Sequence, residues 1–306
     1  MSIINTSSFA SDLLPLVKVW FGDSYKDLPS YYDRMVKVEH TDSNYHVEAI
    51  VDTLGLLQRK NEGSALTYDS AKEVYKPTYQ AVAYALGFII TKEAMDDGIA
   101  MLKAKRFTEQ FKMGALQTRE QIVANLYINA FAASSVTMTN GDGKTLVASD
   151  HPVHGSTQSN LITGGSVDIS EAAIEQIRQD IRNMKNHRGL RIGAMPDKLI
   201  CSVSDEAAAN RILYSKARVA TADNDLNFHR ENNTIPGGIV ANPYLTDSDA
   251  FFVTTTVPNG LKLVVRQEPE IDQSGDFDTK NAKFSVMMRC VAGWSDWRGV
   301  VGSAGV

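Results

Sequence analysis

The sequence lacks the features that mark exported, membrane-spanning or disulfide-stabilised proteins. Only two of its 306 residues are cysteine, and both Cys201 and Cys290 lie in apolar, strand-like runs. We interpret them as small buried apolar residues rather than a disulfide or redox pair, which fits a reducing compartment. The N-terminus has no signal-peptide pattern, and no run approaches the ~18 apolar residues of a membrane helix. We therefore expect a protein made in the cytoplasm, without membrane contact.

An excess of positive charge is also missing. The formal net charge is -5 and the pI is about 5.7, which exclude a general attraction to nucleic acid. Contact with nucleic acid without sequence specificity stays open. With 43% apolar and 22% charged residues, the composition is that of a globular protein, and the chain is long enough to bury a sizeable core.

Enzyme signatures are weak or missing. Gly143-Lys144-Thr145 ends like a phosphate-binding loop, but Met138 stands where that loop needs its first glycine, so a turn is favoured. Residues 150–154, with Asp150, His151 and His154, offer zinc-compatible side chains, but Pro152 indicates a loop, and we favour a hydrogen-bonded anchor. No nucleophile elbow, catalytic cysteine setting or dinucleotide fingerprint occurs. We predict no catalytic, cofactor-binding or metal-binding residue, and a metal-dependent enzyme using residues 150–154 remains a minor alternative.

One acidic stretch could suggest calcium, but its spacing is not that of an EF-hand loop. We interpret it as a solvated loop or as a source of ion pairs between subunits. Its acidic residues are Glu268, Glu270, Asp272, Asp276 and Asp278.

The runs 46–57 and 78–90 both have strand character, and they flank a polar, turn-prone segment. They predict a long hairpin. Because a two-stranded ribbon is marginal alone in water, we expect this arm to lie on a partner chain. Residues 91–133 predict a long helix capped by Thr91, with Gly98 and Gly114 as points where it could bend.

A second unit follows a turn-rich connection at 134–167. After Ser170, a plausible cap, apolar residues recur at helical spacing. We further predict a strand at 198–203, a helix at 204–214, a hairpin at 250–266 through Asn259-Gly260, and a final strand at 283–291. The order is mixed α+β, without regular strand–helix alternation. The helical repeat consists of Ile174, Ile177, Ile181 and Met184.

Residues 1–45 look irregular but carry many large aromatic groups, which a free tail rarely has. We expect this arm to pack on its own domain or on a neighbouring subunit. The aromatic residues are Phe9, Trp20, Phe21, Tyr25, Tyr31 and Tyr32.

The chain also resembles a known family over nearly its whole length. The segments LGFIITKEAMDD, DGKTLVASDHPVHGSTQSNL, RGLRI, FHRENNTIPGGIVANPYLTDSDAFFVTTTVPNGLKL and FDTKNAKFSVMMRCVAGWSDWRGVVGS are similar to parts of tailed-bacteriophage major capsid (major head) proteins. The subgroup resembles short-tailed-phage and Mu-like major head subunits. No single motif decides the likeness, which depends on these segments occurring together.

The resemblance implies the Hong Kong 97-type capsid fold. In that fold we expect an N-terminal arm at 1–45, an extended hairpin (E-loop) at 46–90, and a peripheral domain with a long spine helix at 91–164. An axial domain at 165–262 and a return to the peripheral domain at 263–306 complete the expected organisation. The chain starts at Met1, from which we expect that no scaffolding segment is cleaved and that the scaffold is a separate protein.

The implied function is self-assembly rather than catalysis. Subunits would form hexamers and pentamers of an icosahedral head around phage double-stranded DNA, built in the host cytoplasm and retained in the virion. Expected partners are other copies of the chain, a scaffolding protein and the portal, with a decoration protein as an optional addition. An encapsulin-like bacterial compartment is the alternative.

Particular residues carry further expectations. We do not expect a covalent Lys60–Asn61 type of cross-link. Flexibility is expected at Gly55, Gly63, Gly87 and Gly98. The candidate inter-subunit ion-pair residues, near the hairpin tip, are Arg59, Lys60, Glu62, Lys72 and Glu73.

Overall fold

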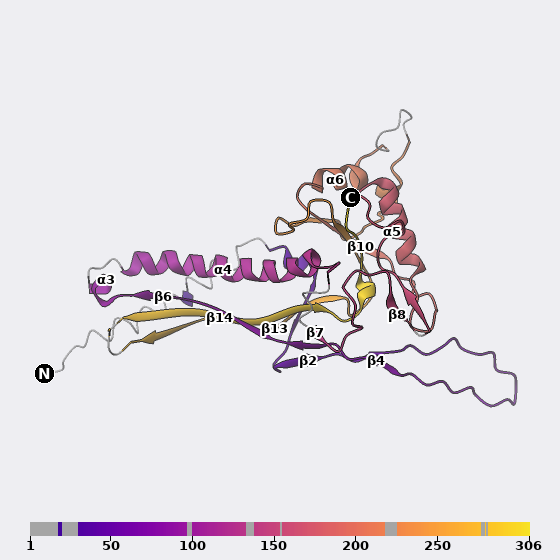
Figure 1. The fold of residues 1–306 in the computed structure, drawn as a ribbon, viewed down its shortest axis with the longest axis horizontal. Coiled ribbons are helices and arrows are strands. Elements are labelled where there is room, and N and C mark those ends of the chain that lie inside the picture. Colours follow the sequence, from indigo (N-terminus) through magenta and orange to yellow (C-terminus); the bar gives the residue numbers. More distant parts are fainter. Residues whose placement is uncertain are drawn as a thin grey trace.

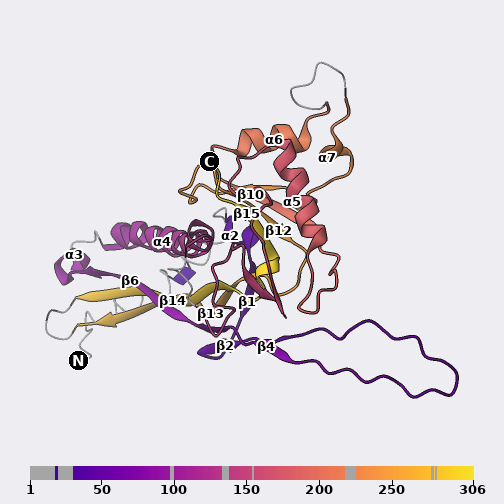
Figure 2. The same cartoon turned by 45° about the vertical axis from the view of Figure 1, so that its right-hand side comes forward.

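The computed structural model describes residues 18–19, 30–96, 100–132, 138–153, 155–217, 225–276, 279 and 281–306. A long layer of one helix on one sheet runs along the molecule, and a second unit rises from one end of it (Figure 1). A loop projects beyond that end, away from both parts (Figures 1 and 2). Most of the predicted N-terminal arm, with Phe9, Trp20, Phe21 and Tyr25, lies outside the described residues.

The long sheet has the strand order β1-β13-β14-β6. Its strands are β1 (Lys37–His40), β13 (Leu261–Gly275), β14 (Ala282–Trp294) and β6 (Val82–Ile90). In β14, Phe284, Val286 and Met288 are buried while Lys283 and Ser285 between them are exposed, the alternation of a half-buried strand. β13 and β6 pair antiparallel with its two edges, and β1 runs parallel to β13.

A helix of 29 residues, α4 (Ala100–Ile128), lies along this sheet (Figure 1). At ~1.5 Å rise per residue it spans about 43 Å. The helix passes through Gly114 without interruption. The ring of Phe88 in β6 lies 5.1 Å from that of Phe107 and 4.9 Å from that of Phe111, so apolar contacts fix the helix on the sheet.

The predicted helix at 91–133 is present as two described pieces. Thr91 caps the short α3 (Lys92–Asp96), since the backbone N–H of Ala94 donates to Thr91 Oγ1 at 3.4 Å. Gly98, a predicted bend, falls outside the described residues.

The second unit contains a sheet of order β11-β10-β12-β15 with helices packed against it. In α5, the predicted cap is confirmed: the N–H of Ala173 donates to Ser170 Oγ at 3.2 Å, and the predicted isoleucines are buried. Cys201 and Cys290 are buried free thiols, as expected, and burial raises their pKa to about 12 and about 11. The elements are α5 (Glu171–Asn183), β10 (Pro196–Cys201), α6 (Glu206–Tyr214), α7 (Phe228–Glu231), β11 (Ile239–Ala241), β12 (Phe251–Thr255), η2 (Trp297–Gly299) and β15 (Val300–Ser303).

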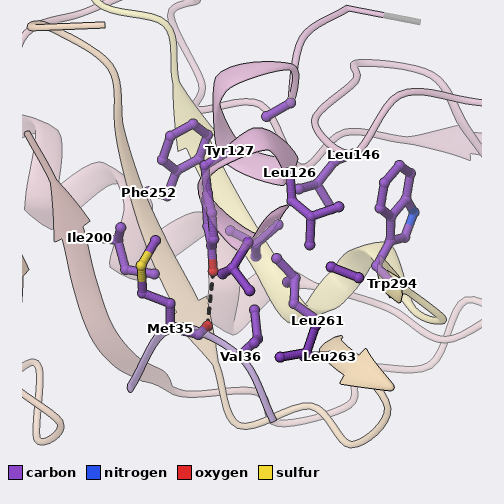
Figure 3. Close-up of a cluster of buried hydrophobic side chains, with 14 of the residues drawn as sticks. Met35, Val36, Leu126, Tyr127, Leu146, Ile200, Phe252, Leu261, Leu263 and Trp294 are labelled. Atoms are coloured by element: carbon purple, nitrogen blue, oxygen red, sulfur yellow. Dashed lines mark hydrogen bonds between the residues drawn. The ribbon is translucent and has the colours of Figure 1, made fainter. Parts of the chain in front are cut away.

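The two parts share one apolar core. Ile200 and Phe252 from the second unit pack with Tyr127 of α4 and Leu263 of β13. Figure 3 shows this cluster, in which the Tyr127 hydroxyl donates to the backbone oxygen of Met35 at 2.9 Å. Met35 belongs to the short α2 (Tyr32–Met35) that leads into β1. Because close-packed cores resist deformation, this cluster holds the second unit at a fixed position on the long layer.

Two predicted pairings are wrong. The strand at 82–90 forms as its periodicity indicated, but β6 pairs with β14 rather than with residues 46–57. The hairpin predicted at 250–266 does not form: Asn259 makes the turn with φ 61, but β12 pairs with β10 and β15, and β13 continues into the long sheet. In both cases the strand pairs with a segment far along the chain instead of with its sequence neighbour.

The remaining strands are short. β2 (Tyr45–Val47) pairs with β5 (Thr78–Gln80), and β3 (Ile50–Val51) with β4 (Glu73–Tyr75), which gives the projecting loop its two-stranded base. β7 (Met138–Thr139) adds to β5, and β8 (His151–Val153) pairs with β9 (Ser156–Gln158).

Candidate functional site

A long loop, residues 52–72, connects β3 to β4 and extends away from the body (Figures 1 and 2). It has no regular secondary structure. Its tip is a turn in which the N–H of Ser64 donates to the Asn61 oxygen at 3.2 Å and Gly63 adopts φ 78, a conformation that favours glycine.

Large apolar side chains of this projecting loop face solvent. Soluble proteins seldom expose so many such groups on one segment, and a cluster of them marks an interaction surface. The exposed fractions are Leu54 62%, Leu56 71%, Leu57 101%, Leu66 63% and Tyr68 89%.

The predicted ion-pair residues are exposed at or near this loop. Among the described residues, no two of the five pair with each other, and Glu73 instead pairs with Lys76 at 2.9 Å. They leave charged groups available around the apolar side chains. The exposed residues are Arg59, Lys60, Glu62, Lys72 and Glu73.

One arginine of the second unit clamps the base of the loop. Arg188 Nε donates to Asp52 Oδ2 at 3.2 Å, NH2 donates to the Ser70 backbone oxygen at 2.6 Å, and NH1 pairs with Asp69. Asn186 Nδ2 donates to Thr53 Oγ1 at 2.6 Å beside it. A backbone hydrogen bond from Gly55, the largest cause, and then Arg188 hold the pKa of Asp69 below its usual value. The clamp therefore joins the two arms of the loop at its base. No local pattern in the sequence predicted this role for Arg188.

A buried ammonium group lies among carboxylates below the loop. Lys262 is 1% exposed, and its Nζ pairs with Glu48 and, at 3.5 Å, with Glu39. His46 Nε2 lies 3.4 Å from Glu48 Oε1. Burial alone would raise the pKa of Glu48, but hydrogen bonds from Lys262 and Ser295 outweigh it and hold that pKa below its usual value. Lys37 Nζ lies 2.9 Å from Glu39 Oε1, so two ammonium groups balance the two carboxylates of this cluster.

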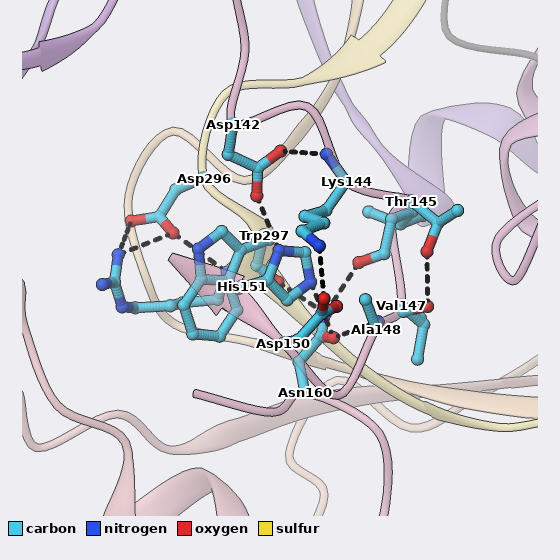
Figure 4. Close-up of polar contacts among 12 residues, drawn as sticks. Asp142, Lys144, Thr145, Val147, Ala148, Asp150, His151, Asn160, Asp296 and Trp297 are labelled. Atoms are coloured by element: carbon cyan, nitrogen blue, oxygen red, sulfur yellow. Dashed lines mark hydrogen bonds and ion pairs between the residues drawn. The ribbon is translucent and has the colours of Figure 1, made fainter. Parts of the chain in front are cut away.

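The predicted anchor at residues 150–154 is a buried polar network (Figure 4). His151 stacks on Trp297 with ring centroids 4.3 Å apart and a 4° interplanar angle. Its Nδ1 lies 2.6 Å from Asp142 Oδ2, and its Nε2 lies 3.0 Å from Asn160 Oδ1. Both ring nitrogens have a side-chain oxygen as partner, so neither faces an open position. His154 lies outside the described residues.

Asn160 connects this network to the chain end. Its Nδ2 donates to the backbone oxygens of Leu146, Trp297 and Val300 at 2.7, 3.1 and 3.1 Å. The suspected phosphate-loop lysine belongs to the same region, since Lys144 pairs with Asp150. The side chains that suggested catalysis therefore hold loops together.

The acidic stretch is not the loop that its composition suggested. Glu268, Glu270 and Asp272 lie on β13, and Asp276 directly follows that strand. Glu268 pairs with the buried Arg119 of α4, while Lys283 Nζ lies 2.8 Å from Asp276 Oδ2. Asp278 lies outside the described residues. Glu268 and Asp276 therefore form ion pairs within the chain, and strand periodicity overrides the turn-like composition.

An open apolar groove lies at the other end of the long layer, where β6 leads to α3 (Figure 1). Its volume is about 520 Å³. Nearby, Leu86 is 57% and Ile89 58% exposed. Exposed apolar surface is therefore present at both ends of the long axis. The groove is lined by Ile89, Ile90, Thr91, Ala94, Arg106, Phe107 and Gln110.

Comparisons with known proteins bear on these surfaces. A family model described as phage capsid protein matches residues 74–303. No curated protein sequence matches the chain. In the part of the chain that the structure describes, no helix combines the length and apolar character needed to cross a bilayer.

Solved structures share the fold at low sequence identity. The capsid of a native GTA particle has 14% identity and a TM-score of 0.56, over 90% of each chain. Mycobacterium phage Adephagia gives 14% and 0.54, over 91% of each chain. A virus-like particle from Pyrococcus furiosus gives 11% and 0.51, over 94% of this chain and 97% of that one. At these identities the likeness establishes a common α+β fold.

Proposed function

The chain belongs to the phage capsid protein family, and we infer that its projecting loop is what joins one subunit to the next. It is a major capsid protein, a structural component of the icosahedral phage head in the virion and not an enzyme. The observation that carries the inference is the set of solvent-exposed leucines and Tyr68 on a loop that its own subunit leaves uncovered.

We assign the finer parts by analogy with the Hong Kong 97-type fold. The projecting loop with its base corresponds to the E-loop, which we now limit to residues 46–80 because β6 belongs to the long sheet. The long layer corresponds to the peripheral domain, with α4 as the spine helix, and the second unit to the axial domain. The segment 1–45 remains proposed as the N-terminal arm, except that its described end is not irregular: α2 and β1 pack on the long layer.

The contact would be head-to-tail. The loop and the apolar groove lie at opposite ends of the long axis, so the loop of one subunit suits the groove end of its neighbour (Figure 1). Such contacts between two different surfaces generate closed rings when the rotation closes, which supports hexamers and pentamers. Each large apolar side chain that becomes fully buried contributes ~1.5–3 kcal/mol, and shell closure makes every subunit multivalent.

The charged residues around the loop would set orientation rather than affinity. Arg59, Lys60, Glu62, Lys72 and Glu73 surround the apolar side chains, where ion pairs mainly affect association rate and salt dependence. A separate scaffolding protein, the portal and a decoration protein remain proposed partners, supported by family membership alone.

The test is assembly of a loop variant beside a charge-matched control. The chain is expressed with its neighbouring open reading frames, and particles are examined by negative-stain electron microscopy and size-exclusion chromatography. We expect Leu57→Asp to leave folded, unassembled subunits, because the charge removes an apolar contact. Gln58→Asp adds the same charge at the adjacent exposed position and should still give shells. Equal assembly of both variants would contradict the proposed role of the loop.

An enzyme-enclosing compartment remains the second candidate, because the virus-like particle chain is covered over 97% of its length. The contents of purified particles separate the two. Double-stranded DNA inside supports the phage head, whereas a protein cargo without DNA supports the compartment.

A further inference from the structure

Two carboxylates and one histidine converge at the start of α5. One carboxylate oxygen from each of Glu171 and Glu175 and one ring nitrogen of His229 all lie within 4.8 Å of one another. The two glutamates are four residues apart, which places them on the same face of the helix. His229 comes from α7, so the group joins two elements that are distant in the sequence.

His229 has a ring nitrogen that the protein leaves unused. The residue is 2% exposed, and its Nδ1 lies 3.3 Å from Thr234 Oγ1. Its Nε2 is buried and makes no well-formed hydrogen bond within the described part of the chain, although the Glu171 backbone interacts weakly with the ring. A buried polar atom without a partner costs free energy, and such atoms in native proteins call for an explanation. A hydrogen bond at one ring nitrogen, with the other left open, is the arrangement that fixes a metal-binding histidine.

The backbone at His229 is also held firmly. Asn227 Oδ1 accepts from the N–H of His229 at 3.0 Å, while Asn227 Nδ2 donates to the backbone oxygens of Ile212 and Ser215 at 2.7 and 3.1 Å. Asn227 is itself buried. The imidazole is therefore positioned before any ligand arrives, which is what a binding site requires.

We propose that Glu171, Glu175 and His229 bind one divalent transition-metal ion, such as Zn²⁺, that ties α5 to α7. Two carboxylate oxygens and one imidazole nitrogen suit zinc, and the imidazole disfavours calcium, which takes oxygen ligands. In a tetrahedral zinc site neighbouring ligand atoms are about 3.4 Å apart, so atoms that lie within 4.8 Å of one another need only a small side-chain movement to bind one ion. Glu175 is exposed and can make that movement by changing rotamer.

Two nearby features have simpler roles. Glu171, in the first turn of α5, interacts favourably with the helix dipole without any metal. The guanidinium of Arg178 lies 4.9 Å from the Phe228 ring centroid, and its charge opposes a second cation nearby. Neither feature accounts for the open Nε2 of His229.

The experiment uses the full-length, unassembled subunit after treatment with a chelator. Zn²⁺ binding is followed by calorimetry, and Co²⁺ is added separately, because its visible absorption reports a nitrogen- and oxygen-bound site. We expect one ion per chain and a rise in thermal midpoint that grows with Zn²⁺ concentration. Glu175→Gln should weaken binding at least about tenfold and reduce the midpoint shift.

Glu206→Gln is the matched control, because Glu206, like Glu175, is an exposed glutamate in the N-terminal half of a helix, α6. It should bind Zn²⁺ as the unchanged chain does. His229→Gln tests the buried ligand and should abolish the Co²⁺ absorption. Absence of stoichiometric binding, or equal affinity in Glu175→Gln and Glu206→Gln, overturns the proposal. Since Glu175 is exposed, its substitution leaves the fold intact. A difference in Zn²⁺ affinity between Glu175→Gln and Glu206→Gln therefore reports loss of a ligand and not loss of structure.

Discussion

Leu57 in the projecting loop is 101% exposed, whereas Ile181 in α5 is fully buried, although both are large aliphatic residues of one chain. Around Ile181 the second unit closes its own apolar cluster, which includes Leu213 and Phe251. Around Leu57 the loop has no such cluster. The second unit is therefore stabilised by its own packing, whereas the loop leaves apolar surface exposed, which we propose a neighbouring subunit covers.

The largest expected effect comes from truncating one aromatic residue in each kind of environment. Trp297 is 1% exposed and stacks on His151, so Trp297→Ala should lower the free energy of unfolding by about 3–5 kcal/mol. Tyr68 is 89% exposed, so Tyr68→Ala should change it by less than about 0.5 kcal/mol. Urea unfolding of the unassembled subunit measures both. A comparable loss in the free energy of unfolding for Tyr68→Ala would mean that the loop packs on its own subunit. That result would contradict the proposed difference between the loop and the second unit.

A smaller effect concerns two carboxyl groups whose pKa values shift in opposite directions. Glu48, at the loop base, has its pKa held below the ordinary 4.5, mainly by Lys262 and Ser295 acting against burial. Its contribution to stability is present above pH 4.5 and is lost as the pH falls through the lower, folded-state value. In α4, burial raises the pKa of Glu120, although the N–H groups of Tyr31 and Tyr32 oppose the rise. Ionised Glu120 therefore costs stability at neutral pH.

Urea unfolding at a series of pH values tests whether ionised Glu48 stabilises the fold and ionised Glu120 destabilises it. Glu48→Gln should lose about 1 kcal/mol at pH 7, and the loss should shrink below pH 4.5. Glu120→Gln should leave the free energy of unfolding at pH 7 unchanged or higher, because the amide oxygen still accepts the two N–H groups. If Glu48→Gln lost as much free energy of unfolding at low pH as at pH 7, Glu48 would contribute through packing and not through its charge.

The smallest expected effect on stability concerns the Arg188 clamp. Partly exposed ion pairs contribute little, so Arg188→Ala should leave the thermal midpoint unchanged within error. Without the clamp the base of the loop opens more often, and trypsin should cut after Arg59 and Lys60 several-fold faster. Arg191→Ala, at an exposed arginine in the same turn region, is the control and should not change the rate. Equal rates in both variants would show that the loop is held by other contacts.

Local patterns in the sequence predicted local structure well. Ser170 and the isoleucines that follow it identified α5 with its cap and its buried face. The alternation of large and small residues identified β6 as a strand. Such signals depend on residues within a few positions of one another, so they survive without knowledge of the fold. The family resemblance, carried by the order of many segments, predicted the α+β capsid fold.

Pairing between distant segments could not be predicted in the same way. The Asn259-Gly260 turn was interpreted as a hairpin, but β12 and β13 leave it for different sheets. The composition around Asp272 suggested a loop, yet β13 runs through it to Gly275. Turn residues and charged residues tolerate several environments, and contacts formed in the tertiary structure decide between them.

The sequence by itself determined where helices begin, which strand faces are apolar, that the cysteines are buried, and that the polar motifs lack the spacing of enzyme sites. Only the tertiary structure decided that Arg188 holds the loop, that Lys262 neutralises Glu48, and that His229 meets Glu171 and Glu175. Hydrogen bonds and ion pairs depend on a few ångströms of separation between atoms. Residues far apart in the chain reach that separation only after the apolar core has fixed the backbone.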